Sequence, residues 1–321
     1  MSGLSDWTSL RNPTPPGVAV EITARRVSAA SLEMRGGRPV IAAHAVEPLP
    51  AGALVPSLTA ANTHDRAAVL TALGGVLERV GRPRRIGLIL PDPIAKVSLV
   101  RFEKVPPRAQ DLDQLIRWQV RKAAPFAIED AQVSYVAGLL APDGQEFVVT
   151  LARRDVVQEY EGLCAAHGAH AGLVDISTFN VINAVLAGSA PSPLADWLLV
   201  NVASDYTSIA ILRGSDLIFF RSRGADSEGT LADLVHQTAM YYEDRLQGAG
   251  FSRVMLSGAS TGSGDVEEIG SSLQLRLGTA VATVDPREAA SLAERITAAP
   301  VLLDTLTPLV GLLVRGREAA A

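Results

Sequence analysis

The feature that most constrains the fold of this chain is a strand–turn–strand pattern that occurs twice. Residues 17–32 read GVAVEITARRVSAASL, and residues 198–212 read LLVNVASDYTSIAIL. Each is an apolar strand, a short polar turn and a second strand with alternating apolar residues, which is typical of a β-hairpin. Because a repeated supersecondary unit indicates an internal duplication, we expect two related halves in the chain.

Size and charge favour a globular protein that does not bind nucleic acid. The chain has 321 residues, of which 48% are hydrophobic and 20% are charged. This length can bury a large core and suggests about two domains. The formal net charge is −5 and the arginines are scattered in small groups, which argues against a basic groove for a phosphate backbone.

Neither metal nor nucleophilic chemistry is indicated. The single cysteine, Cys164, excludes an internal disulfide or a multi-cysteine metal site, and its helical context predicts a small core residue. The histidines have no metal-ligand spacing, so no metal site is predicted. The apolar run 301–314 contains Asp304 and is too short to span a membrane, so direct membrane insertion is not expected.

The order of predicted elements is that of an α/β protein. Strands at 39–46 and 85–90, with a helix at 64–80 between them, follow the first hairpin. Residues 96–174 read as strand, helix, strand, strand, helix and strand, which indicates a compact module of its own. The proline-bearing linker 188–193 marks the clearest domain boundary.

A more specific pattern surrounds the helix predicted at 110–123. Residues 111–126 read DLDQLIRWQVRKAAPF, with a Val-Pro pair before the helix, an Arg-Trp pair within it and a Pro-Phe pair at its end. Together with the two hairpins, this stretch resembles the PilM family of type IV pilus assembly proteins. Further segments resemble that family in the same order, and the resemblance covers about residues 17–317: VTLARRD at 149–155, Gly168, the VDI at 174–176 and the helix at 303–315.

The resemblance implies an α/β, actin-like fold, in which two α/β lobes flank a cleft and a small α+β subdomain is inserted into the first lobe. The corresponding division of this chain is a flexible arm at 1–16, a first lobe at 17–190 with the insertion at 96–174, and a second lobe at 191–321.

The resemblance also implies a partner. Proteins of this family lie at the cytoplasmic face of the inner membrane and hold the N-terminal tail of a bitopic membrane protein, PilN, in a groove between the first lobe and the inserted subdomain. We therefore expect a cytoplasmic scaffold that is peripheral to the membrane through a PilN-like partner, alongside other components of the pilus platform and with possible self-association. Arg117, Arg121 and Phe126 are the candidate partner-binding residues.

Actin-like ATPases carry an aspartate in each hairpin, for magnesium and water, and a glycine two positions later that lets the backbone approach phosphate. Here the first hairpin has Glu21 and Thr23, and the second has Asn201 and Ala203. Glu21 is longer by a methylene, Asn201 has no charge, and the other two residues add side chains where glycine allows contact. The sequence therefore predicts that both hairpins have lost the chemistry of the nucleotide site.

Two further residues complete the candidate nucleotide site. Asp205 is either a displaced acid or a turn former, and Gly258, after a buried strand, resembles half of an adenosine-binding motif. The predicted protein is therefore not an enzyme, has no catalytic residue, and has a degenerate site without a required cofactor. Two alternatives remain: an ATP-binding actin-like switch that uses Mg-ATP, or a GspL-like cytoplasmic component of a type II secretion system.

Overall fold

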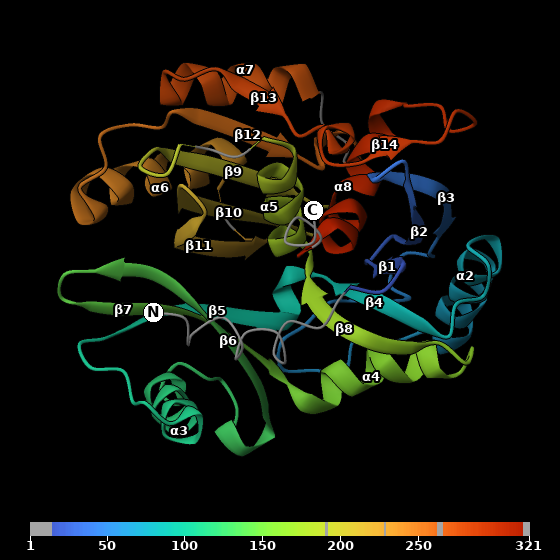
Figure 1. Ribbon diagram of the computed structural model, residues 1–321, viewed down its shortest axis with the longest axis horizontal. Helices are drawn as coiled ribbons and strands as arrows, with labels where there is room; N and C mark the ends of the chain where they lie inside the picture. Colours follow the sequence, from blue (N-terminus) through green and yellow to red (C-terminus); the bar gives the residue numbers. More distant parts are fainter. Residues whose placement is uncertain (1–14, 190–191, 228, 262–265, 317–321) are drawn as a thin grey trace.

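Three β-sheets and the helices that cover them form the protein in the computed structural model (Figure 1), which describes residues 15–189, 192–227, 229–261 and 266–316. The predicted α/β class is confirmed. Almost all of the predicted arm at 1–16 falls outside these residues. Within the described ranges, no helix is long and apolar enough to cross a membrane.

A six-stranded sheet organises the first lobe. Helices α2 (Arg66–Arg79) and α4 (Arg154–Ala165) cover one of its faces, and α8 (Pro300–Val314) covers the other. The central strands are almost wholly apolar because both faces are buried. The order of the strands is β14 (Ser291–Leu292), β3 (Arg38–Pro48), β2 (Arg26–Arg35), β1 (Val18–Ile22), β4 (Arg85–Leu90) and β8 (His170–Ile176).

A five-stranded sheet organises the second lobe. Helices α6 (Leu231–Leu246) and α7 (Val266–Leu277) pack on its outer face, and α5 (Ser177–Gly188) packs on its inner face. The order of the strands is β11 (Asp216–Gly224), β10 (Tyr206–Arg213), β9 (Asp196–Val202), β12 (Arg253–Ser257) and β13 (Val281–Thr283).

Helices α5 and α8 lie between the two large sheets, where their backbones approach closely (Figure 1). A Cβ atom added to Gly311 of α8 would lie 1.7 Å from the carbonyl oxygen of Asn180 in α5. A Cβ atom on Gly87 of β4 would lie 2.2 Å from the Leu312 side chain. Glycine at 311 therefore permits a backbone approach that any larger residue would prevent, whereas at 87 the Leu312 side chain would have to shift.

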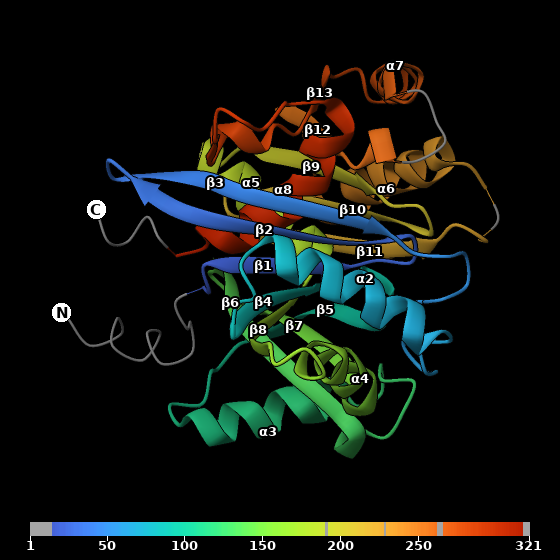
Figure 2. The ribbon, with the colours of Figure 1, turned by 90° about the vertical axis from the view of Figure 1, so that its right-hand side faces the viewer.

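A separate three-stranded sheet projects from the first lobe (Figure 2). Its order is β5 (Ala95–Phe102), β7 (Gly144–Arg153) and β6 (Ala131–Ala141). Helix α3 (Ala109–Val120) covers one face through Ile116 and Val120. The other face packs through Val148 against α5 and the second lobe.

The observed layers do not coincide with the domain limits that were predicted from the sequence. The three-stranded sheet and α3 end at Arg153, whereas the predicted insertion at 96–174 also includes α4 and β8, which pack in the six-stranded layer. At the other end, β14 and α8 belong by sequence to the predicted second lobe at 191–321, yet they pair with and cover the first sheet. Local periodicity identifies a strand but not the strand with which it pairs, because pairing depends on distant residues.

Candidate functional site

The two repeated hairpins lie at the junction of the lobes and are related by a shift of 180 residues. In the first hairpin Glu21 pairs with Ser28, and in the second Asn201 pairs with Ser208. The duplication therefore extends to strand register. It places the two candidate metal-site positions, Glu21 and Asn201, at equivalent places on the two sheets.

The turns of the two hairpins are closed by the same backbone hydrogen bond. The N–H of Thr23 donates to the carbonyl of Arg26, and the N–H of Ala203 donates to the carbonyl of Tyr206, each at 2.9 Å. The Thr23 hydroxyl adds a second bond to the Arg26 carbonyl, also at 2.9 Å. Thr23 thus uses its side chain to close its own turn.

Glu21 is buried and its carboxylate is already occupied. The hydroxyl of Ser177 donates to Oε1 at 2.9 Å, the hydroxyl of Ser28 donates to Oε2 at 3.4 Å, and the Arg26 guanidinium lies 3.7 Å from Oε2. Burial raises the pKa of Glu21, and the Arg26 charge opposes that shift. Both carboxylate oxygens therefore already have partners within the protein.

A second buried carboxylate, Asp92, joins the two lobes. It accepts hydrogen bonds from the backbone N–H of Thr178 at 3.0 Å, from the Thr178 hydroxyl, and from the Ser208 hydroxyl at 2.5 Å. The amide of Asn201 donates to the same Thr178 hydroxyl at 2.8 Å. Burial raises the pKa of Asp92 to about 6, although the hydroxyl and amide donors lower it.

Asp92 was not among the site residues predicted from the sequence. Its signal is its place directly after β4, where the chain enters the short 3₁₀ helix Asp92–Ile94. Polar residues at the carboxyl ends of central parallel strands gather at ligand sites in α/β sheets. Thr178, at the start of α5, has no comparable signal in the sequence.

The Gly258 loop is closed by a carboxylate from another helix. Gly258 has φ of +79°, and a Cβ atom there would lie 2.0 Å from the carbonyl oxygen of Val202. The backbone N–H groups of Gly258 and Ser260 donate to Oδ1 and Oδ2 of Asp304, each at 2.9 Å, and the Ser260 hydroxyl also donates to Oδ2. These donors of the loop that was predicted to belong to a nucleotide site are therefore used within the protein.

Asp205 lies in the turn of the second hairpin. Its carboxylate accepts a hydrogen bond from the Ser204 hydroxyl at 3.2 Å, and its carbonyl accepts one from the N–H of Ala225 at 2.8 Å. Burial raises the pKa of Asp205. It does not line the cavity between the hairpins.

The space enclosed between the hairpins is small. The cavity lined by Glu21, Asn201, Gly258 and Asp304 has a volume of about 30 Å³, enough for one or two water molecules. Ligand pockets that hold drug-sized molecules have volumes of at least about 300 Å³. The residues present therefore do not fit a magnesium nucleotide, and the described part of the chain contains no group of three or more His, Cys, Asp or Glu residues suited to a metal ion.

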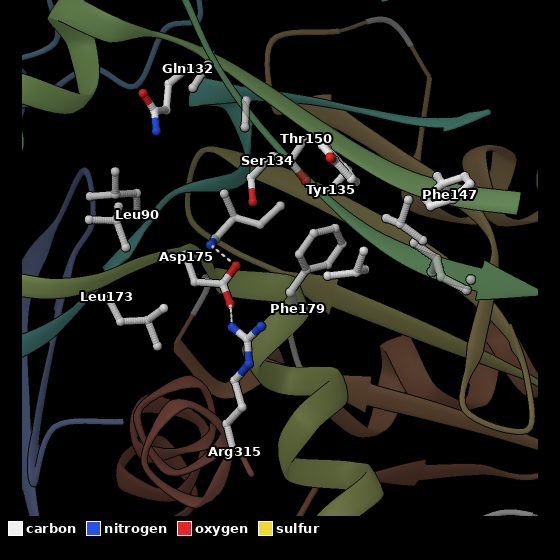
Figure 3. A pocket seen from close by; sticks show the side chains of 18 of the residues that line it. Leu90, Gln132, Ser134, Tyr135, Phe147, Thr150, Leu173, Asp175, Phe179 and Arg315 are labelled. Atoms are coloured by element: carbon white, nitrogen blue, oxygen red, sulfur yellow. Dashed lines mark hydrogen bonds and ion pairs between the residues drawn. The ribbon is translucent and has the colours of Figure 1, made fainter. Parts of the chain in front are cut away.

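A much larger groove opens where the three-stranded sheet meets the rest of the protein (Figure 3). Its volume is about 1340 Å³, and its walls come from β6 and β7, from β8, from α5 and from the turn between β10 and β11. Leu173 and Phe179 contribute apolar surface. Arg315 reaches in from the end of α8 and pairs with Asp175 at 2.8 Å. Burial raises the pKa of Asp175, and the charge of Arg315 opposes the shift.

The three candidate partner-binding residues lie on or just after α3. None of Arg117, Arg121 and Phe126 is among the residues that line the groove. Arg117 pairs with Asp113 one helical turn away at 2.8 Å, Arg121 is exposed, and Phe126 packs against the α3 core. The groove wall formed by β6 and β8 carried no signal in the sequence, because two strands distant in the chain create it.

Comparison with known proteins gives one family and several structures. Residues 19–244 match the family model described as type IV pilus assembly protein PilM. A search of curated protein sequences finds no match.

Among solved structures, a PilM–PilN type IV pilus biogenesis complex matches with a TM-score of 0.77 and 19% identity, covering 95% of this chain and 99% of that one. A protein of unknown function with an actin-like ATPase fold, from Bacteroides thetaiotaomicron, matches with a TM-score of 0.50 and 9% identity over 82% of this chain and 89% of that one. The cytoplasmic domain of EpsL, an inner-membrane component of the type II secretion system of Vibrio cholerae, has a TM-score of 0.49 and 11% identity, covering 95% of this chain and 95% of that one. The first two likenesses confirm the predicted actin-like fold.

Proposed function

Because the chain belongs to the PilM family of type IV pilus assembly proteins, we propose that it is a non-enzymatic scaffold whose groove holds the N-terminal cytoplasmic tail of a PilN-like bitopic membrane protein. The protein would then be cytoplasmic and peripheral to the inner membrane through that partner. The observation that carries the proposal is the groove of about 1340 Å³ at the junction of the three-stranded sheet and the first lobe.

The groove suits a peptide better than a small molecule. Ligand pockets have volumes of about 300–1,000 Å³, and this groove, at about 1340 Å³, is larger. Its lining is mixed, with apolar side chains such as Leu173 and Phe179 and a half-buried ion pair between Asp175 and Arg315. Apolar anchors and backbone groups are the means by which preformed grooves bind short peptides.

In this proposal the cleft between the hairpins is a structural junction. Asp92 and Asp304 accept hydrogen bonds across it from donors of the second lobe, so these donors are already used within the protein. This supports a degenerate nucleotide site and argues against an ATP-driven switch.

The tail interaction is tested by calorimetry with the purified full chain and a synthetic peptide of the cytoplasmic tail of the PilN-like protein from the same cell. Saturable binding is expected. Ser134 is exposed and lines the groove, so Ser134→Trp should abolish binding by filling it. Ser272→Trp, at an exposed position on α7, is the matched control and should bind as the wild type does. No binding by the wild type would refute the proposal.

The degenerate cleft is tested separately by titrating Mg-ATP into the same protein. No saturable heat is expected. Micromolar binding would refute the view that the cleft is a closed junction and would favour the switch.

A further inference from the structure

One motif of the sequence takes no part in the groove or in the junction between the lobes. It is the Arg-Trp pair in α3, together with the basic residues that follow it. The first half of α3 borders the groove through Ala109 and Leu112. Trp118, Arg121 and Lys122, in the second half and at the end of the helix, do not line the groove. Their surface is therefore not used by the groove.

Helix α3 lies at the outer edge of the molecule, on the small sheet (Figure 2). It packs on that sheet through Ile116 and Val120. Trp118, Arg121 and Lys122 are spaced three and four residues apart, so they share one face of the helix, opposite the packed face. The Trp118 side chain is 67% exposed, and both basic residues are exposed. We refer to these three residues as the α3 patch.

The α3 patch is basic in a chain that is acidic overall. Residues 114–128 contain three basic residues and no acidic residue, whereas the whole chain has a formal net charge of −5. Arg117 is the third base, and it pairs with Asp113 at 2.8 Å. Within the part of the chain that the structure describes, Arg121 and Lys122 form no ion pair. Their charges can therefore meet an anionic surface.

An exposed indole with neighbouring cations is the composition of sites that lie on a membrane surface. Tryptophan is enriched at the level of lipid headgroups, because its ring is amphipathic. Each Lys or Arg near an anionic leaflet gains about fivefold in affinity. The exposed side chains beside Trp118, Gln114 and Gln119, are polar, so they do not form the apolar centre of a protein interface. An acidic residue on the same face, Asp111, lies two turns away, at roughly 10 Å along the helix.

We propose that the α3 patch docks on the anionic phospholipid headgroups of the inner membrane, with Trp118 among the headgroups and Arg121 and Lys122 against their phosphates. The proposal rests on the proposed function, because the tail in the groove brings the chain to the bilayer. The groove reaches Leu112, so about 14 Å of helix separates it from Arg121. The attraction of the patch then adds to that of the tail, since two linked contacts with one membrane act at a high effective concentration.

The deciding experiment is co-sedimentation of the purified full chain with lipid vesicles, at low ionic strength and without the tail. One set of vesicles contains phosphatidylethanolamine with phosphatidylglycerol, and the other contains neutral phosphatidylcholine. The chain should sediment with the anionic vesicles and not with the neutral ones, and added salt should release it. Absence of sedimentation with the anionic vesicles would overturn the proposal in favour of an acidic protein surface as the occupant.

Charge reversal tests whether the patch itself is responsible. The double variant Arg121→Glu/Lys122→Glu should lose about tenfold or more of its affinity for anionic vesicles. Arg245→Glu/Arg276→Glu is the matched control, because these exposed arginines also lie at the C-terminal ends of helices, α6 and α7, and their reversal changes the net charge equally. The control should bind as the wild type does. Equal binding by the two double variants would overturn the proposal, since net charge would then govern binding.

The indole is tested in the same assay. Trp118→Ala should lower the affinity for anionic vesicles about fivefold, because burial of part of a large aromatic side chain contributes about that much. Leu275 is 87% exposed on α7, so Leu275→Ala is the matched control and should leave binding unchanged. A Trp118→Ala variant that binds as tightly as the wild type would contradict insertion of the ring.

Calorimetry with the tail of the PilN-like protein separates this proposal from the proposed function. The patch variants should bind the tail as the wild type does, because the α3 patch does not line the groove. Loss of tail affinity in these variants would overturn the assignment of the patch to lipid. If the wild type binds anionic vesicles but not the tail, the proposed function fails and the lipid site stands.

Discussion

The carboxylate of Asp304 accepts a hydrogen bond from the backbone N–H of Gly258 at 2.9 Å, which joins α8 to the loop after β12. The same carboxylate holds Ser260 through its N–H and its hydroxyl. The loop after β12 is thus held in place by a carboxylate of the protein itself.

Asp304→Ala should lower the free energy of unfolding by about 2–3 kcal/mol, because it leaves two backbone N–H groups and one hydroxyl without an acceptor. Asp304→Asn keeps one acceptor oxygen and should lose less. Urea denaturation of the wild type and of both variants checks this order of stability. An alanine variant as stable as the wild type would show that the carboxylate does not hold the loop.

The stability contributed by Asp92 should depend on pH. Its folded pKa is raised from 3.8 to about 6, so the folded state binds more protons than the unfolded state between these values. The contribution of Asp92 to the free energy of unfolding is therefore fully present below about pH 4 and is lost as the pH rises towards 6. For a shift of about two pKa units the loss is about 3 kcal/mol.

The measurement compares wild type with Asp92→Asn by urea denaturation at about pH 4 and about pH 7. Glu21, whose pKa is also raised by burial, is present in both proteins, and its charge contributes to the raised pKa of Asp92. The wild type should gain relative to the variant on acidification. A difference that is constant with pH would mean that Asp92 does not titrate in this range.

Gly311→Ala should destabilise the protein by about 3 kcal/mol or more, because the added methyl group would collide with the backbone of Asn180 and force α5 and α8 apart. Gly270, in α7, has no atom within 4 Å of its Cβ position. Gly270→Ala is the matched control, and its better helix propensity should raise stability by about 0.5–1 kcal/mol. Thermal unfolding distinguishes the two; similar melting temperatures would contradict the close helix contact.

Cys164 should resist alkylation in the folded protein. It is buried in α4, and burial raises the pKa of its thiol to about 12, so almost no thiolate is present at neutral pH. Mass spectrometry after iodoacetamide treatment should show an unmodified chain under native conditions and one adduct in urea. Rapid native labelling would place the thiol at the surface.

The types and order of the elements were predictable from the sequence where the pattern was local. The two hairpins, the helix at 110–123 and the strand at 85–90 all lie within a residue or a few of the observed β1–β2, β9–β10, α3 and β4. Glu21 and Asn201, which were predicted as candidate site residues, both line the cavity at the junction of the lobes. The groove was expected from the family resemblance, but its lining was not, and Arg117, Arg121 and Phe126 do not line it.

The sequence by itself determined that this is an α/β chain with a duplicated hairpin and without the acid–glycine pairs of an ATPase, because periodicity and residue identity are local properties. Only the tertiary structure decided which distant groups contact those hairpins and the loop beside them. Ser177 reaches Glu21 across 156 residues, and Asp304 reaches Gly258 across 46. Contacts between residues so far apart depend on how the layers pack, and a pattern within any one segment does not contain that information.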